Sequence, residues 1–215
     1  MKTACVSVRY NDYLKLFIDH NKSLLDDLTV ITDPRDLATI KFCDESGVKT
    51  FLSNSFNKMG AAFNKGGAIN DFLASIPEES EEWILLMDSD ILLPKELDLP
   101  NLVKGLNKEL LYGIGRQFIY SYEGYRSYTQ GNLDHFDEEP EGFAWGYFQL
   151  WNNQSSIYKS MNPKYVDHYS ASHSDGVFRA AFENNGALLE LDYKGIHLGR
   201  HGVNHQGRVS QNFFS

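Results

Sequence analysis

An apolar run that ends in two acidic residues constrains the fold of this chain more than any other feature. Residues 83–87, Trp-Ile-Leu-Leu-Met, are followed at once by Asp88-Ser89-Asp90. A short apolar run bounded by polar residues is typical of a buried strand, and ligands of an open α/β sheet bind beyond the carboxyl ends of its strands. The run therefore predicts a buried strand that carries Asp88 and Asp90 into a ligand site.

The two acidic residues predict a metal site at the end of this strand. Side chains at i and i+2 of an extended chain lie on the same face, and two carboxylates so close repel each other unless a cation lies beside them. Mg²⁺ and Mn²⁺ fit this demand because they take oxygen ligands and often share them with a phosphate. The alternative is an ordinary strand-to-turn junction, where Asp is common.

The first half of the chain alternates between strand and helix patterns. Apolar, β-rich runs predict strands at residues 3–9, 28–32, 48–52 and 83–87, and apolar residues at helical spacing predict helices at 12–25, 35–44, 64–76 and 94–106. Such alternation indicates a parallel α/β sheet with right-handed crossovers.

The second half changes character and is rich in Tyr, Phe and Gly. Residues 111–120, 143–151 and 187–192 are predicted as strands of a mixed region, residues 174–184 as a helix, and the last twenty or so residues lack periodicity. A length of 215 residues suits one domain. We therefore expect a single domain, 1–215, with a nucleotide- and metal-binding half at 1–108 and an acceptor-side half at 109–215 that ends in a lid segment.

The composition limits the classes of binding partner and the cellular compartment that we expect for this chain. The formal net charge of -9 argues against a duplex nucleic acid as partner, although a local basic patch leaves a nucleic-acid acceptor open. No segment approaches the roughly 18 apolar residues of a membrane span, and the N-terminal residues do not form a signal peptide. Cys5 and Cys43 are too few for a disulfide framework. We expect a cytoplasmic protein without a membrane span.

Four motifs follow one another in a recognisable order. Asn64-Lys65-Gly66-Gly67-Ala68-Ile69-Asn70 precedes the strand at 83–87, Asp88-Ser89-Asp90 and Pro94 follow it, and Ser174-Asp175-Gly176-Val177-Phe178-Arg179 and His197-Leu198-Gly199 come later. This order resembles the inverting, family-2-type glycosyltransferases of the GT-A fold, and the resemblance covers residues 3–199. Ser174 stands where that family usually has Glu.

The resemblance implies transfer of a sugar from a nucleoside-diphosphate donor, with a UDP-sugar favoured, to an acceptor hydroxyl with inversion. It implies that Asp90 binds Mn²⁺ (or Mg²⁺), that Asp88 does so through water or contacts the donor ribose, and that His197 completes the metal site. Asp175 is the implied general base. A structural hydrogen bond is the alternative role for His197, and a helix N-cap is the alternative for Ser174 or Asp175.

Further residues are expected to contact the substrates, since the resemblance places the donor over the first two strands. The expected donor-binding residues are Tyr10, Asn11, Asp33, Lys65, Asp88, Ser89, Arg200 and His201, with His205 and Arg208 in the same basic, Gly-rich terminal segment. The expected acceptor-binding residues are Trp145, Gly146, Tyr147 and Gln149, although most aromatic residues of this region are expected in the core. The acceptor itself is a saccharide or another hydroxyl compound.

Three other functions compete with this interpretation. A nucleotidyltransferase normally has a Gly-rich phosphate loop after its first strand, and residues 8–13 contain no Gly. A haloacid-dehalogenase-type phosphatase carries its Asp-x-Asp near the N-terminus, whereas this one lies mid-chain. A non-catalytic nucleotide-sugar-binding module remains, and metal-dependent turnover would separate it from an enzyme.

Overall fold

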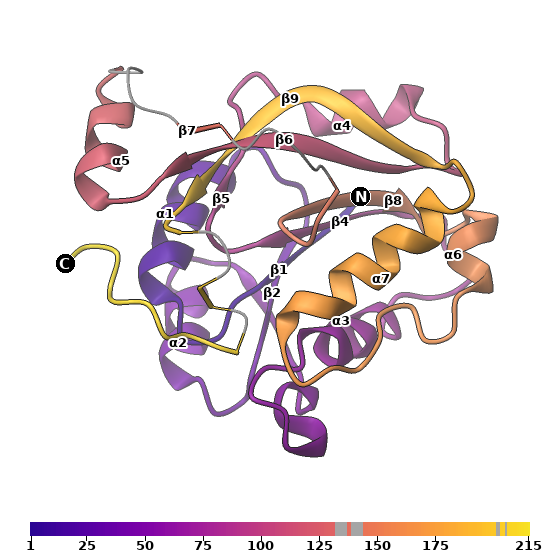
Figure 1. Cartoon of the computed structure of the whole chain (residues 1–215), viewed down its shortest axis with the longest axis horizontal. Helices are drawn as coiled ribbons and strands as arrows, with labels where there is room; N and C mark the ends of the chain where they lie inside the picture. Colours follow the sequence, from indigo (N-terminus) through magenta and orange to yellow (C-terminus); the bar gives the residue numbers. More distant parts are fainter. Residues whose placement is uncertain (132–136, 139–143, 201–202, 205) are drawn as a thin grey trace.

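A computed structural model describes residues 1–131, 137–138, 144–200, 203–204 and 206–215 (Figure 1). The described strands form one sheet in the order β3-β2-β1-β4-β8-β6-β9-β5, and β7 pairs with β6. The strands are β1 (Lys2–Val6), β2 (Leu28–Thr32), β3 (Lys49–Leu52), β4 (Trp83–Asp88), β5 (Ile91–Leu92), β6 (Leu111–Ile119), β7 (Asp137–Glu138), β8 (Phe148–Asn152) and β9 (Leu188–Leu198).

Helices cover both faces of the sheet. The α-helices are α1 (Asn11–Asn21), α2 (Leu37–Glu45), α3 (Lys65–Leu73), α4 (Leu99–Leu102), α5 (Tyr122–Thr129), α6 (Ser156–Ser160) and α7 (Ala171–Glu183), with 3-10 turns η1 (Ser55–Gly60) and η2 (Val103–Gly105). Helices α1 and α2 lie on one face, and α3 and α7 on the other (Figure 1). No helix among the described residues combines the length and apolar character that a membrane crossing requires.

Strand β4 explains why the sheet is buried on both faces. Its side chains alternate, so that Leu85 and Met87 join the core under α1 while Ile84 and Leu86 join the core under α3 and α7. Burial of each of these apolar side chains stabilises the fold by on the order of 2 kcal/mol. A continuous apolar run is therefore what a central strand between two helical layers requires.

The parallel half of the sheet sets the position of the ligand site. β3, β2, β1 and β4 run parallel to one another, so their carboxyl ends meet at the same edge. β8 pairs antiparallel with β4, and β6 pairs parallel with β9, which makes the sheet mixed beyond β4. Both the parallel first half and the mixed second half agree with the sequence-based prediction.

Several predicted elements differ in extent. The expected helix at 94–106 is only α4 and η2, since Pro94 and Pro100 restrict its start and Asp98 caps it at Leu99. The expected strand at 143–151 begins at Phe148: residue 143 lies outside the described residues, and a backbone bond from the Phe148 N–H to the Trp145 carbonyl makes residues 145–148 a turn. The short elements β5, α5 and α6 were not predicted.

Helix α7 and strand β9 begin or end away from their predicted limits, and both changes affect the site. α7 begins at Ala171 after Ser170, so Ser174 and Asp175 lie inside the helix and the N-cap alternative for them is wrong. β9 continues to Leu198 because it pairs with β6 along its length, with an irregularity between Ile114 and Gly115. His197 is therefore a strand residue. The predicted strand ends at residue 192 and does not include it.

Candidate active site

Asp90 and His197 meet beyond the carboxyl end of β4. Asp90 lies in the turn between β4 and β5, and its carbonyl accepts a hydrogen bond of 2.8 Å from the Leu198 N–H. Pairing of Ile91 with His197 fixes the two strands in register. The Nε2 atom of His197 lies 3.8 Å from Oδ2 of Asp90. The sequence therefore brings together a carboxylate and an imidazole that are more than a hundred residues apart.

Asp88 ends β4 and contacts an ammonium group. Lys65, the first residue of α3, places Nζ 2.6 Å from Oδ1 of Asp88 and 2.9 Å from Oδ2 of Asp175. Burial disfavours the charged ammonium, but attraction by Asp175 and Asp88 outweighs burial and raises the pKa of Lys65. Burial also raises the pKa of Asp88, with Asp90 adding to the effect and Lys65 opposing it. The two neighbouring acids thus repel each other as expected, and the attraction of Lys65 for Asp88 is larger than this repulsion.

Gly146 lets Asp175 approach the backbone. A Cβ atom at this position would lie 1.8 Å from Oδ2 of Asp175 and 2.8 Å from Nζ of Lys65. No side chain larger than that of glycine fits between the carboxylate and the chain here. We call Asp88 and Asp175, together with Lys65 between them, the acidic centre. Gly146, one of the four expected acceptor residues, contacts this centre through its backbone alone.

The other three acceptor candidates differ in exposure. Trp145 is 40% exposed, and the Arg179 guanidinium lies 4.9 Å from its ring centroid. Tyr147 is buried and donates a hydrogen bond of 2.7 Å to the Ile114 carbonyl. Gln149 is buried too: its Nε2 donates to the Ala144 carbonyl, and its Oε1 accepts from the Tyr165 hydroxyl at 2.7 Å. Of the four acceptor candidates, Trp145 alone has an exposed side chain, and its ring lies beside Gly176, the residue after Asp175.

A pocket of about 220 Å³ lies at the carboxyl ends of β1 and β2. Asp33, which follows β2, lines it and accepts hydrogen bonds from Arg35 and from Asn57 Nδ2. The Arg35 hydrogen bond outweighs burial and lowers the pKa of Asp33. Lining side chains from beyond the expected set are Arg9, Arg35, Asp36, Phe56, Asn57 and Phe63. The sequence did not point to these residues because they come from loops and from the 3-10 turn η1, which carry no motif.

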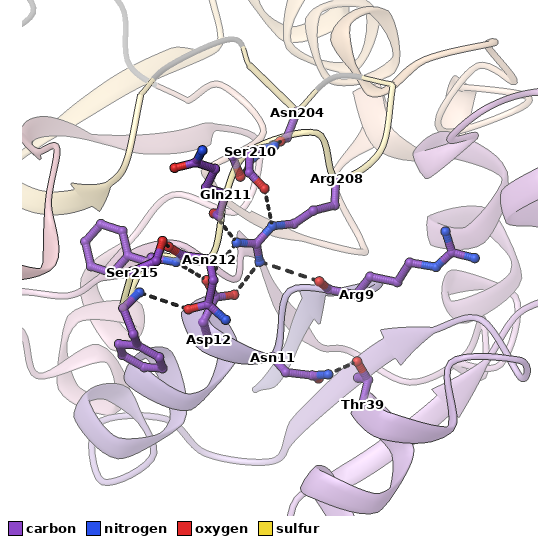
Figure 2. Close-up of polar contacts among 12 residues, drawn as sticks. Arg9, Asn11, Asp12, Thr39, Asn204, Arg208, Ser210, Gln211, Asn212 and Ser215 are labelled. Carbon is purple, nitrogen blue, oxygen red and sulfur yellow. Dashed lines mark hydrogen bonds and ion pairs between the residues drawn. The ribbon is translucent and has the colours of Figure 1, made fainter.

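Tyr10 and Asn11 lie beside this pocket but point elsewhere. Tyr10 is buried, and its hydroxyl lies 3.4 Å from the Asn204 carbonyl, to which it donates. Asn11 Oδ1 accepts a hydrogen bond of 2.8 Å from the Thr39 hydroxyl, which ties the start of α1 to α2 (Figure 2). Both residues therefore have structural partners within the fold.

The C-terminal segment returns to the start of α1. Figure 2 shows Arg208 between Asp12 and the carbonyls of Arg9, Ser210 and Gln211. Its Nη2 lies 2.7 Å from Oδ2 of Asp12, and its Nη1 contacts the other carboxylate oxygen. Arg208 and Gly207 also line the pocket. Arg200 is exposed just after β9, and His201 and His205 lie outside the described residues.

The metal-ligating side chains suit a divalent ion that also binds substrate, and they are too few to surround an ion with protein ligands alone. Within the described residues, no group of three or more His, Cys, Asp and Glu side chains is arranged to hold a metal. Asp90 and His197 supply one oxygen and one nitrogen donor at one place, while Asp88 contacts Lys65. Such a partial set fits an ion that completes its coordination with substrate oxygens and water, as Mg²⁺ and Mn²⁺ do.

Comparison with solved structures identifies the fold. Glucosyl-3-phosphoglycerate synthase from Mycobacterium tuberculosis matches 93% of this chain and 72% of its own at a TM-score of 0.59, with 15% sequence identity. The chain has a GT-A fold. No protein-family model matches the sequence, and no curated protein is significantly similar to it.

The GT-A neighbours were solved with substrates bound. One structure of the Mycobacterium tuberculosis synthase contains Mn²⁺, UDP-glucose and phosphoglyceric acid. A second, with a TM-score of 0.58 and 14% identity over 93% of this chain and 72% of its own, contains Mn²⁺, UDP-glucose and glycerol 3-phosphate. The likeness of these proteins to this chain is one of fold.

Proposed function

We propose that this protein transfers a sugar from a UDP-sugar to an acceptor hydroxyl with the help of Mn²⁺ or Mg²⁺. The observation that carries the proposal is the meeting of Asp90 and His197 beyond β4, at the same sheet edge as the pocket at the ends of β1 and β2. In α/β sheets this edge is where nucleotides bind. The GT-A neighbours solved with Mn²⁺ and UDP-glucose support the same assignment.

Asp90 and His197 would hold the metal ion, with Asp88 linked to it through water or contacting the donor ribose. When bound, the ion supplies positive charge that stabilises the departing diphosphate. Asp90 and His197 are well placed for this task because both are mostly buried and the pairing of β5 with β9 holds them in register. Ser89, in the turn between the two acids, offers its backbone to the donor.

The pocket at the ends of β1 and β2 would hold the donor nucleoside. Asp33 presents carboxylate oxygens to a ribose or base from a position that Arg35 and Asn57 fix. Tyr10 and Asn11 would shape the pocket from the start of α1. Arg200, together with His201 outside the described residues, would attract the diphosphate from the segment after β9. A cationic segment beside a phosphate site is a recurring feature of anion binding.

Asp175 would take the proton from the attacking acceptor hydroxyl. Its carboxylate is 13% exposed and lies against Gly146, with the exposed ring of Trp145 next to it. The Lys65 ammonium lies 2.9 Å from Oδ2 of this carboxylate and holds it in place, and a carboxylate in hydrogen-bonding reach of a hydroxyl can act as a base. Direct attack by an acceptor that Asp175 deprotonates would invert the configuration at the sugar carbon. The acceptor would be a saccharide or another hydroxyl compound.

A donor screen tests the proposal. The wild-type protein would be incubated with UDP-, GDP- and TDP-sugars, Mn²⁺, Mg²⁺ or EDTA, and phosphoglyceric acid, glycerol 3-phosphate and simple saccharides as acceptors. We expect UDP release from one UDP-sugar that requires the metal and is lost in Asp90→Asn and Asp175→Asn. Metal-dependent UDP binding without release under any condition would instead support a non-catalytic nucleotide-sugar-binding module.

A further inference from the structure

Lys65 lies beneath the acidic centre rather than at its surface. Its side chain is 3% exposed, whereas the Asp88 and Asp175 side chains that it contacts are 33% and 13% exposed. The ammonium is thus covered by the two carboxylates, and the carboxylates face the site. This arrangement is the reverse of what a phosphate-binding lysine needs, since such a residue presents its ammonium to the ligand.

The three N–H donors of the ammonium all have protein acceptors. Nζ lies 2.6 Å from Asp88 Oδ1, 2.9 Å from Asp175 Oδ2 and 3.5 Å from the Gly146 carbonyl. A lysine ammonium has three donors, so contact with a donor phosphate would require one of these bonds to break. The three acceptors come from β4, from α7 and from the chain before β8. Lys65 therefore joins three parts of the site that are distant in sequence.

The sequence around Lys65 holds it in this place. Asn64 caps α3 by accepting a hydrogen bond of 3.0 Å from the Gly67 N–H, and it also donates to Asp167 at 2.9 Å. A Cβ on Gly66 would lie 2.2 Å from the Val166 carbonyl oxygen and 2.9 Å from the Ser174 Cβ. The glycine is thus needed for α3 to pack against α7. The residues Asn64-Lys65-Gly66-Gly67 therefore let α3 and α7 pack closely. This close packing brings Nζ of Lys65 within hydrogen-bonding distance of Asp175.

We propose that Lys65 is a positioning residue that holds the Asp175 carboxylate against Gly146, and that it does not bind the donor phosphate. The inference rests on the proposed function, since it assigns a role within that reaction. Asp88 is the last residue of β4, which pairs with β1 and β8, whereas Asp175 reaches the ammonium from α7. Loss of the ammonium would therefore free chiefly the Asp175 carboxylate, which lies against Gly146. Lys65 would therefore act on the acceptor-side step through Asp175.

The test compares Lys65→Met, which keeps the length and removes the charge, with Lys58→Met as matched control. Lys58 is exposed and pairs with Asp167 at 3.6 Å, so its loss removes a nearby positive charge outside the acidic centre. Turnover with the donor found in the screen would be measured together with UDP affinity by calorimetry. For Lys65→Met we expect kcat to fall about 100-fold, the usual cost of a misplaced catalytic group. We expect UDP affinity to change less than about threefold, because no phosphate contact is lost. Lys58→Met should match the wild type.

The same substitution in the Asp175→Asn background shows whether Lys65 acts through Asp175. Residues that act as one unit are strongly non-additive, so Lys65→Met should reduce kcat of Asp175→Asn by less than about threefold. Additive losses would overturn the inference, as would a fall in UDP affinity equal to the fall in kcat. An inactive wild type would count against the proposed function, whereas an active wild type with additive losses counts against the role of Lys65 alone.

Two further measurements keep the inference testable where Lys65→Met folds poorly or turnover is low. In Lys65→Ala, ethylammonium should restore kcat in a saturable way, and ethanol should not, because the space beside the two carboxylates accepts a small cation. A crystal structure of Lys65→Met should show the Asp175 carboxylate displaced from Gly146. Equal effects of ethylammonium and ethanol, or an unmoved Asp175, would overturn the inference.

Discussion

Arg208 and Asp12, which are 196 residues apart in the chain, form a two-point ion pair at the first turn of α1. Asp12 also accepts a hydrogen bond of 2.5 Å from the Phe213 N–H, and the Phe213 ring packs against Tyr13 at 5.0 Å between centroids. The pair ties the C-terminal segment to the start of α1. Because Arg208 also lines the pocket, this contact sets one of its walls.

Loss of this ion pair should destabilise the fold. Arg208→Met leaves the Asp12 carboxylate buried without its guanidinium, and such a change costs about 3 kcal/mol. The exposed pair Lys15–Asp19, with 3.1 Å between charged atoms, provides the control: Lys15→Met should cost less than about 0.5 kcal/mol. Urea denaturation measures both free energies of unfolding. Equally small losses for the two variants would show that the C-terminal segment is not fastened as described.

The same pair should give the protein a specific acid sensitivity. Burial opposes ionisation of Asp12, but hydrogen bonds from Arg208 and Phe213 outweigh burial and lower its pKa. A carboxylate whose pKa is lower in the folded state stabilises the fold above its unfolded pKa, about 3.9, and loses this contribution as the pH falls through the lower folded value. Below about pH 4 the stability of the wild type should therefore fall more steeply than that of Asp12→Asn. Parallel stability curves from urea titrations at pH 2 to 6 would contradict this account.

Gly146→Ala should disturb the acidic centre. The added Cβ would lie 1.8 Å from Asp175 Oδ2, so the carboxylate must move and kcat should fall about 100-fold. Gly105→Ala is the matched control, since no described atom lies within 4 Å of a Cβ built there. Its activity and melting temperature should equal those of the wild type. Full activity of Gly146→Ala would mean that Asp175 does not work from the position seen here.

Trp145 and Tyr147 should respond to substitution in opposite ways. Tyr147→Phe removes a buried hydrogen bond to the Ile114 carbonyl and should cost about 1 kcal/mol of stability without a change in acceptor KM. Trp145→Ala removes a partly exposed ring beside Asp175 and should raise acceptor KM several-fold with little loss of stability. Thermal denaturation and acceptor titration separate the two effects. A raised acceptor KM in Tyr147→Phe alone would reverse the two assignments.

The parallel half of the fold could be predicted because its signals are local. The run at residues 83–87 is apolar on both faces, as a strand between two helical layers must be, and β2 is found at the predicted residues 28–32. The clustering of Asp88, Asp90, Asp175 and His197 near one sheet edge also follows from motif order together with the fold.

The parts that could not be predicted depend on contacts between distant segments. β9 continues past His197 to Leu198 because β6 supplies a partner strand. The residues at 193–198 show no pattern that predicts this pairing. Lys65 was expected to face a phosphate; its actual partners come from β4 and α7, and only the close packing at Gly66 and Gly146 brings them within reach. Arg208 was expected in a mobile lid, and its partner Asp12 has the sequence context of an ordinary first-turn acid.

Calorimetric titration of UDP, with Mn²⁺ or with EDTA, reports on a metal-dependent UDP site without knowledge of the sugar or the acceptor. The account predicts that the wild type binds UDP in the presence of Mn²⁺, and that EDTA or Asp90→Asn weakens binding at least about tenfold, which corresponds to about 1.4 kcal/mol. The exposed variant Lys15→Met should bind like the wild type. UDP binding that is equally strong with EDTA and in Asp90→Asn, or no UDP binding at all, would contradict a metal-dependent UDP-sugar site at the end of β4.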